Sequence, residues 1–170
     1  VDRVILCWDG NPGYKDFWEN LSPIYKDIFN IHPTLFFMGS EEQMKKCNLV
    51  EGATDRHDIF RLKNVTEVNR EMFDDGMYWG RATFSRNWSA TWAIFYGASL
   101  FPEDVCATSG LDSVLLSDRF FDFIRDDMQP KEDDWVKDKM VIPLGDAYDN
   151  GRFSNTFPTS HVTAKGRIFK

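Results

Sequence analysis

Short apolar runs alternate with segments of helical periodicity along most of the chain, and this alternation limits the possible folds more than any other feature. Runs rich in β-branched and aromatic residues predict four strands, near residues 3–8, 34–38, 58–62 and 104–109. Apolar residues recur at helical spacing from 17 to 28 and again from 84 to 101. Strands that alternate with helices form βαβ units, so the sequence predicts an α/β fold with a mainly parallel central sheet and helices on both faces.

Local signals mark the faces and ends of these elements. The apolar face of the first helix is predicted to consist of Phe17, Leu21, Ile24, Tyr25 and Ile28. Ser40 is a predicted N-cap, and Pro102 ends the long helix. Ser117 is predicted to cap a further helix that runs through Arg125. Residues 140–170 are expected to form short strands and loops that cover a cleft.

Composition and charge exclude several classes of protein. A chain of 170 residues, 42% of them hydrophobic, suits a single domain over residues 1–170 with its own core. The formal net charge of −7 argues against a nucleic-acid partner, because such a partner needs a basic surface. No apolar stretch reaches the roughly 18 residues of a membrane helix, so no transmembrane segment is expected. Cys7 and Cys106 lie in apolar runs and are expected to be buried thiols, which suits a soluble protein in the reducing cytoplasm.

Two polar segments follow predicted strands at the edge where such sheets bind ligands. The first is the turn from Asp9 to Tyr14, and the second runs from Ser109 to Asp112. A divalent cation held by one or two carboxylates neutralises the charge of a diphosphate, which lets the diphosphate depart as a leaving group. Asp112 is therefore a candidate metal ligand; the alternative is that it only caps a turn.

A second group of charged residues lies in the turn-rich segment from Gly145 to Phe153. Asp146, Asp149 and Arg152 are close together there, and such residues can serve as a general base and an anion clamp. The alternative is a surface turn that contains a salt bridge.

Near the end of the chain, His161 lies in a strand-like run of small residues and is a candidate metal ligand through its neutral imidazole. The alternative is a packed, hydrogen-bonded histidine. Lys165 and Gly166 are expected either to approach a phosphate or simply to end a strand. His32 and His57 have no clustered partners and are interpreted as structural.

Together these segments resemble the GT-A fold glycosyltransferases, and most of all a group from large DNA viruses of algae and from some eukaryotes. The order of parts carries the resemblance. The polar turn Trp8–Tyr14 follows the first strand, and the long helix Arg86–Leu100 precedes the strand that leads to the metal motif. A late Gly-Asp-Ala-Tyr-Asp segment at 145–149 is followed by Ser160-His161 near Ala-Lys-Gly at 164–166. The likeness spans nearly the whole chain.

The resemblance implies a single GT-A-like, Rossmann-like domain and a set of partners. The donor would be a nucleotide-diphosphate sugar, expected to be a UDP-sugar, and the acceptor a glycan or another hydroxyl compound. The cofactor would be Mn²⁺ or Mg²⁺, held by Asp112 and His161, and Asp146 or Asp149 would face the sugar or activate the acceptor. The implied nucleotide-sugar ligands are Asp9, Asn11, Tyr14, Arg86, Leu111 and Lys165. A viral protein of this kind would act in the host cytoplasm.

The chain departs from the family at the metal motif. The family's Asp-x-Asp corresponds here to Gly110-Leu111-Asp112, so the first carboxylate is missing and the second is kept. This departure supports an alternative function, a non-catalytic module that binds a sugar nucleotide or a glycan. A different α/β enzyme with carboxylate-bound metals, such as a nucleotidyltransferase, is a third hypothesis. The chain has no Walker-type P-loop and no GxGxxG motif, which argues against simple NTPases and dinucleotide-dependent dehydrogenases.

Overall fold

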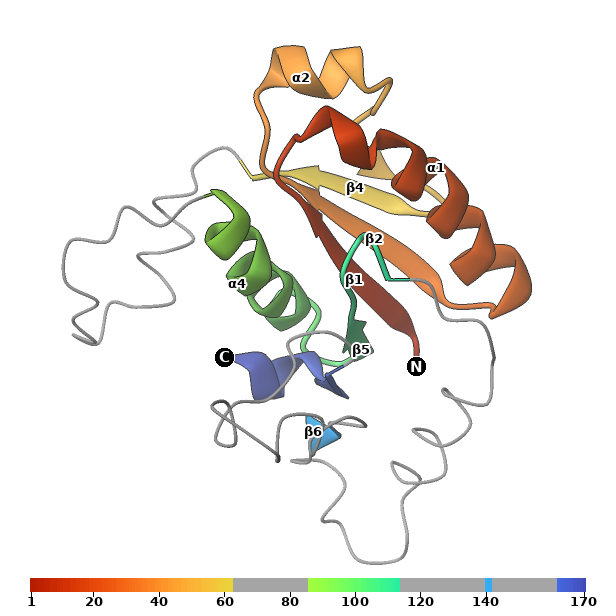
Figure 1. Cartoon of the computed structure of the whole chain (residues 1–170). Helices are drawn as coiled ribbons and strands as arrows, with labels where there is room; N and C mark the ends of the chain where they lie inside the picture. Colours follow the sequence, from red (N-terminus) through yellow and green to blue (C-terminus); the bar gives the residue numbers. More distant parts are fainter. Residues whose placement is uncertain (63–85, 114–139, 142–161) are drawn as a thin grey trace, which may run out of the picture.

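The computed structural model describes residues 1–62, 86–113, 140–141 and 162–170, and Figure 1 shows their arrangement. The strands of this described part form one sheet in the order β3-β4-β2-β1-β5-β7-β6. Their bounds are β1 Arg3–Trp8, β2 His32–Phe37, β3 Gly52–Ala53, β4 Asp58–Arg61, β5 Val105–Thr108, β6 Met140–Val141 and β7 Thr163–Lys165. The chain therefore has an α/β fold.

The centre of the sheet is parallel and its edges are antiparallel. β1 pairs with β2 from Arg3–His32 to Trp8–Phe37, and β4 and β5 extend the parallel part on either side. β3 pairs antiparallel with β4, and β7 pairs antiparallel with β5 and β6. The predicted strands near 3–8, 34–38, 58–62 and 104–109 are thus confirmed as β1, β2, β4 and β5.

Helices cover both faces of the sheet, as the sequence predicted (Figure 1). α1 and α2 lie over one face, whose core includes Val4, Leu6 and Trp8 of β1. α4 lies over the other face, with a core that includes Ile5 and Cys7. The bounds of the helices are η1 Pro12–Tyr14, α1 Lys15–Pro23, the π-helix η2 Ile24–Ile28, α2 Glu41–Lys46, α4 Arg86–Ser99 and η4 Gly166–Phe169. Within the described residues, no helix combines the length and the apolar content needed to cross a membrane.

The buried face of α1 and η2 differs from the predicted one. Trp18, Leu21 and Tyr25 are buried, whereas Phe17 and Ile28 are 40% and 69% exposed. Residues 18, 21 and 25 also have helical spacing, and burial of the Trp18 indole removes more apolar surface from water than burial of the Phe17 ring. The predicted helix is therefore confirmed; Leu21 and Tyr25 are buried as predicted, whereas Trp18 takes the inward position expected for Phe17, and Ile28 is exposed.

The predicted helix ends agree with the observed caps. Ser40 Oγ accepts the Gln43 N–H at 3.1 Å, and Gln43 Oε1 accepts the Ser40 N–H at 2.8 Å, which is a capping box. α4 ends at Ser99, three residues before Pro102. The helix predicted from Ser117 onwards lies outside the described residues.

Gly166 ends β7 at a point where no side chain fits. A Cβ atom there would lie 2.1 Å from the carbonyl oxygen of Phe101 and 2.5 Å from that of Ala98. The glycine thus lets the end of β7 meet the last turn of α4, so it has a packing role at this position.

The three cysteines are buried free thiols, as was expected for Cys7 and Cys106. Burial raises the pKa of Cys106 to about 12, and it raises the pKa of Cys7 as well. Neither thiol is a nucleophile at neutral pH, because the thiolate is the reactive form.

Candidate functional site

β1 and β5 are parallel neighbours whose carboxyl ends point to the same edge of the sheet, where the strand order reverses; Thr108, the last residue of β5, lies opposite Ile5 of β1. β2 lies beside β1, and β4 lies beside β2. β5 comes later in the chain and pairs with the other side of β1. Counted along the chain, the parallel strands have the order third, second, first, fourth, which is the first part of the 3-2-1-4-5-6 order of a dinucleotide-binding sheet. Ligands of such sheets bind at the carboxyl ends of the strands beside this reversal.

The segment that follows β1 is held in place by its own polar groups. Asp9 Oδ1 accepts the Asn11 N–H at 2.9 Å, and Asn11 Oδ1 accepts the Gly13 N–H at 3.0 Å. The Trp8 indole N–H donates to the Asn11 carbonyl oxygen at 2.7 Å. The turn is therefore well defined, with Asn11 exposed and Tyr14 half-buried. Three of the predicted nucleotide-binding residues, Asp9, Asn11 and Tyr14, belong to it.

The loops after β1 and β2 are in contact through two glycines. Gly10 has φ +86°, and a Cβ atom there would lie 3.1 Å from Gly39 Cα and 3.3 Å from Gln43 Nε2. A Cβ atom at Gly39 would lie 2.6 Å from the Phe37 ring. A glycine after each strand is visible in the sequence, but only the pairing of β1 with β2 brings the two together. This contact holds the loops after β1 and β2 against each other at the carboxyl ends of the two strands.

The segment that follows β5 turns sharply and leaves one carboxylate exposed. The Ser113 N–H donates to the Gly110 carbonyl oxygen at 3.1 Å, which closes the turn. Leu111 is 5% exposed and packs in the core on the α1 side, whereas Asp112 is exposed. The predicted contact of Leu111 with a nucleotide is therefore restricted to its backbone, since its side chain is buried.

The observed turn does not use Asp112 as a side-chain cap. Among the described residues, none donates a hydrogen bond to the Asp112 carboxylate, and the backbone alone closes the turn. The carboxylate lies over Gly110, where a Cβ atom would be 2.8 Å from Asp112 Oδ1. Both carboxylate oxygens of Asp112 are thus available to a ligand from solvent.

The structure separates the two predicted basic ligands of the nucleotide. Arg86 is the first residue of α4, which begins near the edge where β1, β2 and β4 end (Figure 1). Lys165 pairs with Val105 at the start of β5, and its Nζ donates to the Glu103 carbonyl oxygen at 3.2 Å. The antiparallel direction of β7 places Lys165 at the opposite edge of the sheet. The structure therefore does not bring Lys165 together with Asp112.

The remaining predicted site residues, Asp146, Asp149 and His161, lie outside the described residues. Within the described ranges, no three His, Cys, Asp or Glu side chains gather into a group that could hold a metal ion. Cation binding at Asp112 would thus depend on phosphate oxygens of a ligand, or on side chains beyond these ranges.

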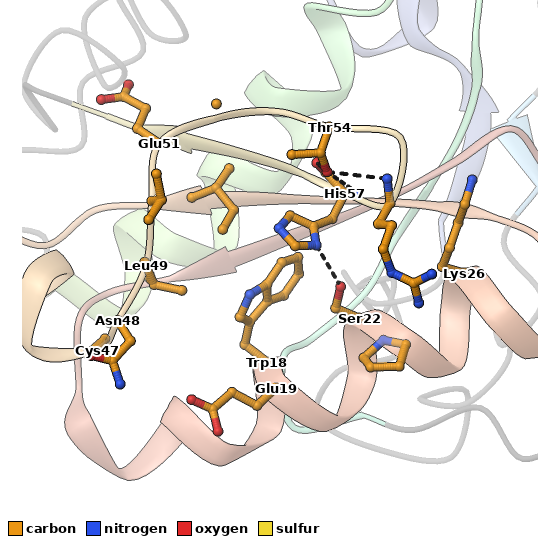
Figure 2. A pocket seen from close by; sticks show the side chains of 15 residues that line it. Trp18, Glu19, Ser22, Lys26, Cys47, Asn48, Leu49, Glu51, Thr54 and His57 are labelled. Carbon is orange, nitrogen blue, oxygen red and sulfur yellow. Dashed lines mark hydrogen bonds between the residues drawn. The ribbon is translucent and has the colours of Figure 1, made fainter.

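A separate groove of about 400 Å³ lies on the α1 side of the sheet, beside β3 and β4 (Figure 2). Trp18 and Ser22 of α1 line it together with Leu49 and His57. Ser22 Oγ lies 3.4 Å from His57 Nδ1, and the centres of the Trp18 and His57 rings are 5.6 Å apart in an edge-on arrangement. Sequence reasoning missed this groove, because its walls come from segments that no local pattern connects.

Comparison of the chain with models of protein families, with curated proteins and with solved structures gave no significant match.

His57, which lines this groove, is expected to make the free energy of unfolding of the chain depend on pH. Burial lowers the pKa of His57 below its usual value of 6.5, and the nearby Asp58 carboxylate opposes this shift only in part. The folded chain then binds fewer protons than the unfolded chain, so the free energy of unfolding falls as the pH drops below about 6.5. We expect the free energy of unfolding, measured with urea, to fall less in His57→Gln than in the wild type when the pH is lowered from 7.5 to 5.5.

The matched control for this prediction is Ser22→Ala. It removes the hydroxyl beside His57 but keeps the imidazole, so the pH dependence should persist. Equal pH dependence in His57→Gln and the wild type would show that His57 is not responsible.

Proposed function

We propose that this chain is a glycosyltransferase of the GT-A type, which transfers a sugar from a nucleotide-diphosphate donor, expected to be a UDP-sugar, to a hydroxyl acceptor. One observation carries the proposal: two polar segments follow neighbouring parallel strands on the side of the sheet where the strand order reverses. These are the turn from Asp9 to Tyr14 after β1 and the segment from Ser109 to Asp112 after β5. A nucleotide bound between them would occupy the position that sheets of this kind give to such ligands.

The exposed carboxylate supports a role for a divalent cation. Mg²⁺ is usually bound through one or two carboxylates together with substrate phosphates, so Asp112 alone meets the minimum that the protein must supply. When bound, Mn²⁺ or Mg²⁺ would neutralise the diphosphate as it leaves the sugar. His161, which lies outside the described residues, would be the second ligand.

The other residues would act by binding and orientation. The turn from Asp9 to Tyr14 would border the base and ribose, and Arg86, at the start of α4, would reach the nucleotide from the other side of the sheet. Asp146 or Asp149 would orient the sugar or take the proton of the acceptor hydroxyl, which is ordinary carboxylate chemistry.

A specific observation also favours a second candidate, a non-catalytic module that binds a sugar nucleotide or a glycan. Gly110 stands where the family resemblance leads one to expect the first carboxylate of Asp-x-Asp. A site with one carboxylate fewer carries less negative charge and attracts a cation less strongly.

The decisive experiment is thermal unfolding with UDP, GDP and CDP and with their sugar conjugates, each in MnCl₂ or in EDTA. A ligand at about 100 times its dissociation constant adds about 2.7 kcal/mol to the stability. For a domain of this size, that gain raises the melting temperature by roughly 5 to 10 °C. We expect such a rise with at least one sugar nucleotide, and we expect EDTA to abolish it.

The possible results separate the two candidates. A metal-dependent rise together with release of the free nucleoside diphosphate from the sugar conjugate supports the enzyme. A rise that persists in EDTA, without release, supports the binding module. No rise with any of these compounds contradicts both.

A further inference from the structure

A buried hydroxyl pair lies directly beneath the turn that carries Asp112. Tyr25, in the π-helix η2, is fully buried, and its hydroxyl donates to Ser109 Oγ at 3.2 Å. Ser109 is also buried, with 1% of its surface exposed. Residues 25 and 109 are far apart in the sequence, so this contact connects α1 and η2 to the carboxyl end of β5.

The hydrogen bonds continue from this pair into the turn. Ser109 Oγ donates to the Gly110 carbonyl oxygen at 3.2 Å, and the same oxygen accepts the Ser113 N–H at 3.1 Å. The Gly110 carbonyl belongs to the peptide unit just before Leu111, one residue away from Asp112. Tyr25 thus acts on the orientation of that peptide unit through Ser109.

The local structure of η2 fixes the position of the Tyr25 hydroxyl. Pro23 has no N–H to donate within the helix, and the following turn is a π turn in which the Phe29 N–H reaches the Ile24 carbonyl oxygen. The Ile31 N–H then donates to the Tyr25 carbonyl oxygen at 2.9 Å. Single π turns of this kind occur often at functional sites.

We propose that Tyr25 is a positioning residue for the site at Asp112: through Ser109 it holds the turn in the orientation in which the carboxylate receives the cation of a metal–nucleotide complex. This inference rests on the proposed function. An apolar residue would fill the core equally well, but it would leave Ser109 without its donor and the turn without this restraint. Groups that orient a metal ligand are known to affect metal affinity strongly.

The test compares Tyr25→Phe with the wild type by calorimetric titration with UDP in MnCl₂, and melting temperatures are measured in parallel. Tyr25→Phe removes only the hydroxyl. We expect it to weaken binding about threefold to tenfold, the effect of one hydrogen bond. The matched control is Ser22→Ala, which deletes a buried hydroxyl three residues earlier, in α1, where its hydrogen-bond partner is His57 rather than the turn at Asp112. It should change the melting temperature without changing the affinity for UDP and Mn²⁺.

Ser109→Ala provides a second route to the same answer if Tyr25→Phe folds poorly. It breaks the same chain of hydrogen bonds, so it should weaken binding by a similar factor. The double variant should bind no more weakly than Ser109→Ala alone, because the two residues act in series. Wild-type affinity in both Tyr25→Phe and Ser109→Ala would overturn the inference and leave the proposed function standing. Absence of UDP binding by the wild type would overturn the proposed function, and the inference with it.

Discussion

Asp112→Asn is expected to abolish metal-dependent nucleotide binding while leaving the fold intact. Asn keeps the size and polarity of the side chain but removes the charge that attracts a cation. We expect the affinity for UDP in MnCl₂ to fall about a hundredfold or more, because the charge of the ligands sets the affinity for a hard cation. Asp112 is exposed and receives no hydrogen bond from a described residue, so the free energy of unfolding should change by less than about 0.5 kcal/mol.

Two further variants make this result specific. Asp55→Asn removes an exposed carboxylate in the segment between β3 and β4, and it should leave binding unchanged.

Gly110→Asp restores the paired carboxylates. Its Cβ atom would meet Asp112 Oδ1 at 2.8 Å and Ser113 Oγ at 3.1 Å, both ends of flexible side chains that can move. We expect Gly110→Asp to strengthen metal-dependent binding about tenfold. If Asp112→Asn keeps wild-type affinity and metal dependence, then Asp112 is not the metal ligand.

The strands could be predicted where the sequence has a run of apolar, β-branched or aromatic residues. The four parallel strands have runs of β-branched and aromatic residues, and their burial on both faces explains why those runs are almost continuously apolar. β3 comprises only Gly52 and Ala53 and has no such pattern, so it was not predicted. The face of α1 was misjudged because Phe17 and Trp18 are adjacent and both apolar. Only packing against the sheet decides which of them is buried.

The candidate site was predictable in its parts but not in its assembly. The Asp9–Tyr14 turn and Asp112 follow strands, and the rule for parallel sheets places both at the carboxyl edge. Their adjacency depends on the pairing of β1 with β5, which local sequence does not encode. The separation of Lys165 from Asp112 could not be predicted for the same reason, since it follows from the antiparallel register of β7 with β5. The link from Tyr25 to Ser109 joins segments with no shared pattern.

The second large effect concerns Arg3, which ties the starts of the parallel strands together. Its guanidinium donates to Asp58 Oδ2 at 2.5 Å, to Thr34 Oγ1 at 2.6 Å and to Asp104 Oδ2 at 3.0 Å. The guanidinium carbon also lies 3.9 Å from the centre of the Phe101 ring. Asp58 is only 5% exposed; its other oxygen lies 3.0 Å from His32 Nε2, so Arg3 supplies the partner that is charged at neutral pH whatever the protonation of the histidine. One residue of β1 thus contacts β2, β4 and the segment before β5.

Arg3→Met is expected to lower the free energy of unfolding by about 3 to 5 kcal/mol, because it removes the arginine from a buried carboxylate and leaves only His32 beside it. Urea unfolding at pH 7.5, followed by tryptophan fluorescence, measures this loss. Adding Asp58→Asn to Arg3→Met should recover part of it, since the uncompensated charge is then gone. The matched control is Arg56→Met, which removes an ion pair in which Arg56 Nη2 donates to both carboxylate oxygens of Asp27 and both side chains are about half exposed. An exposed pair contributes less than about 1 kcal/mol. If Arg3→Met costs no more than Arg56→Met, the network around Asp58 does not hold the strands together.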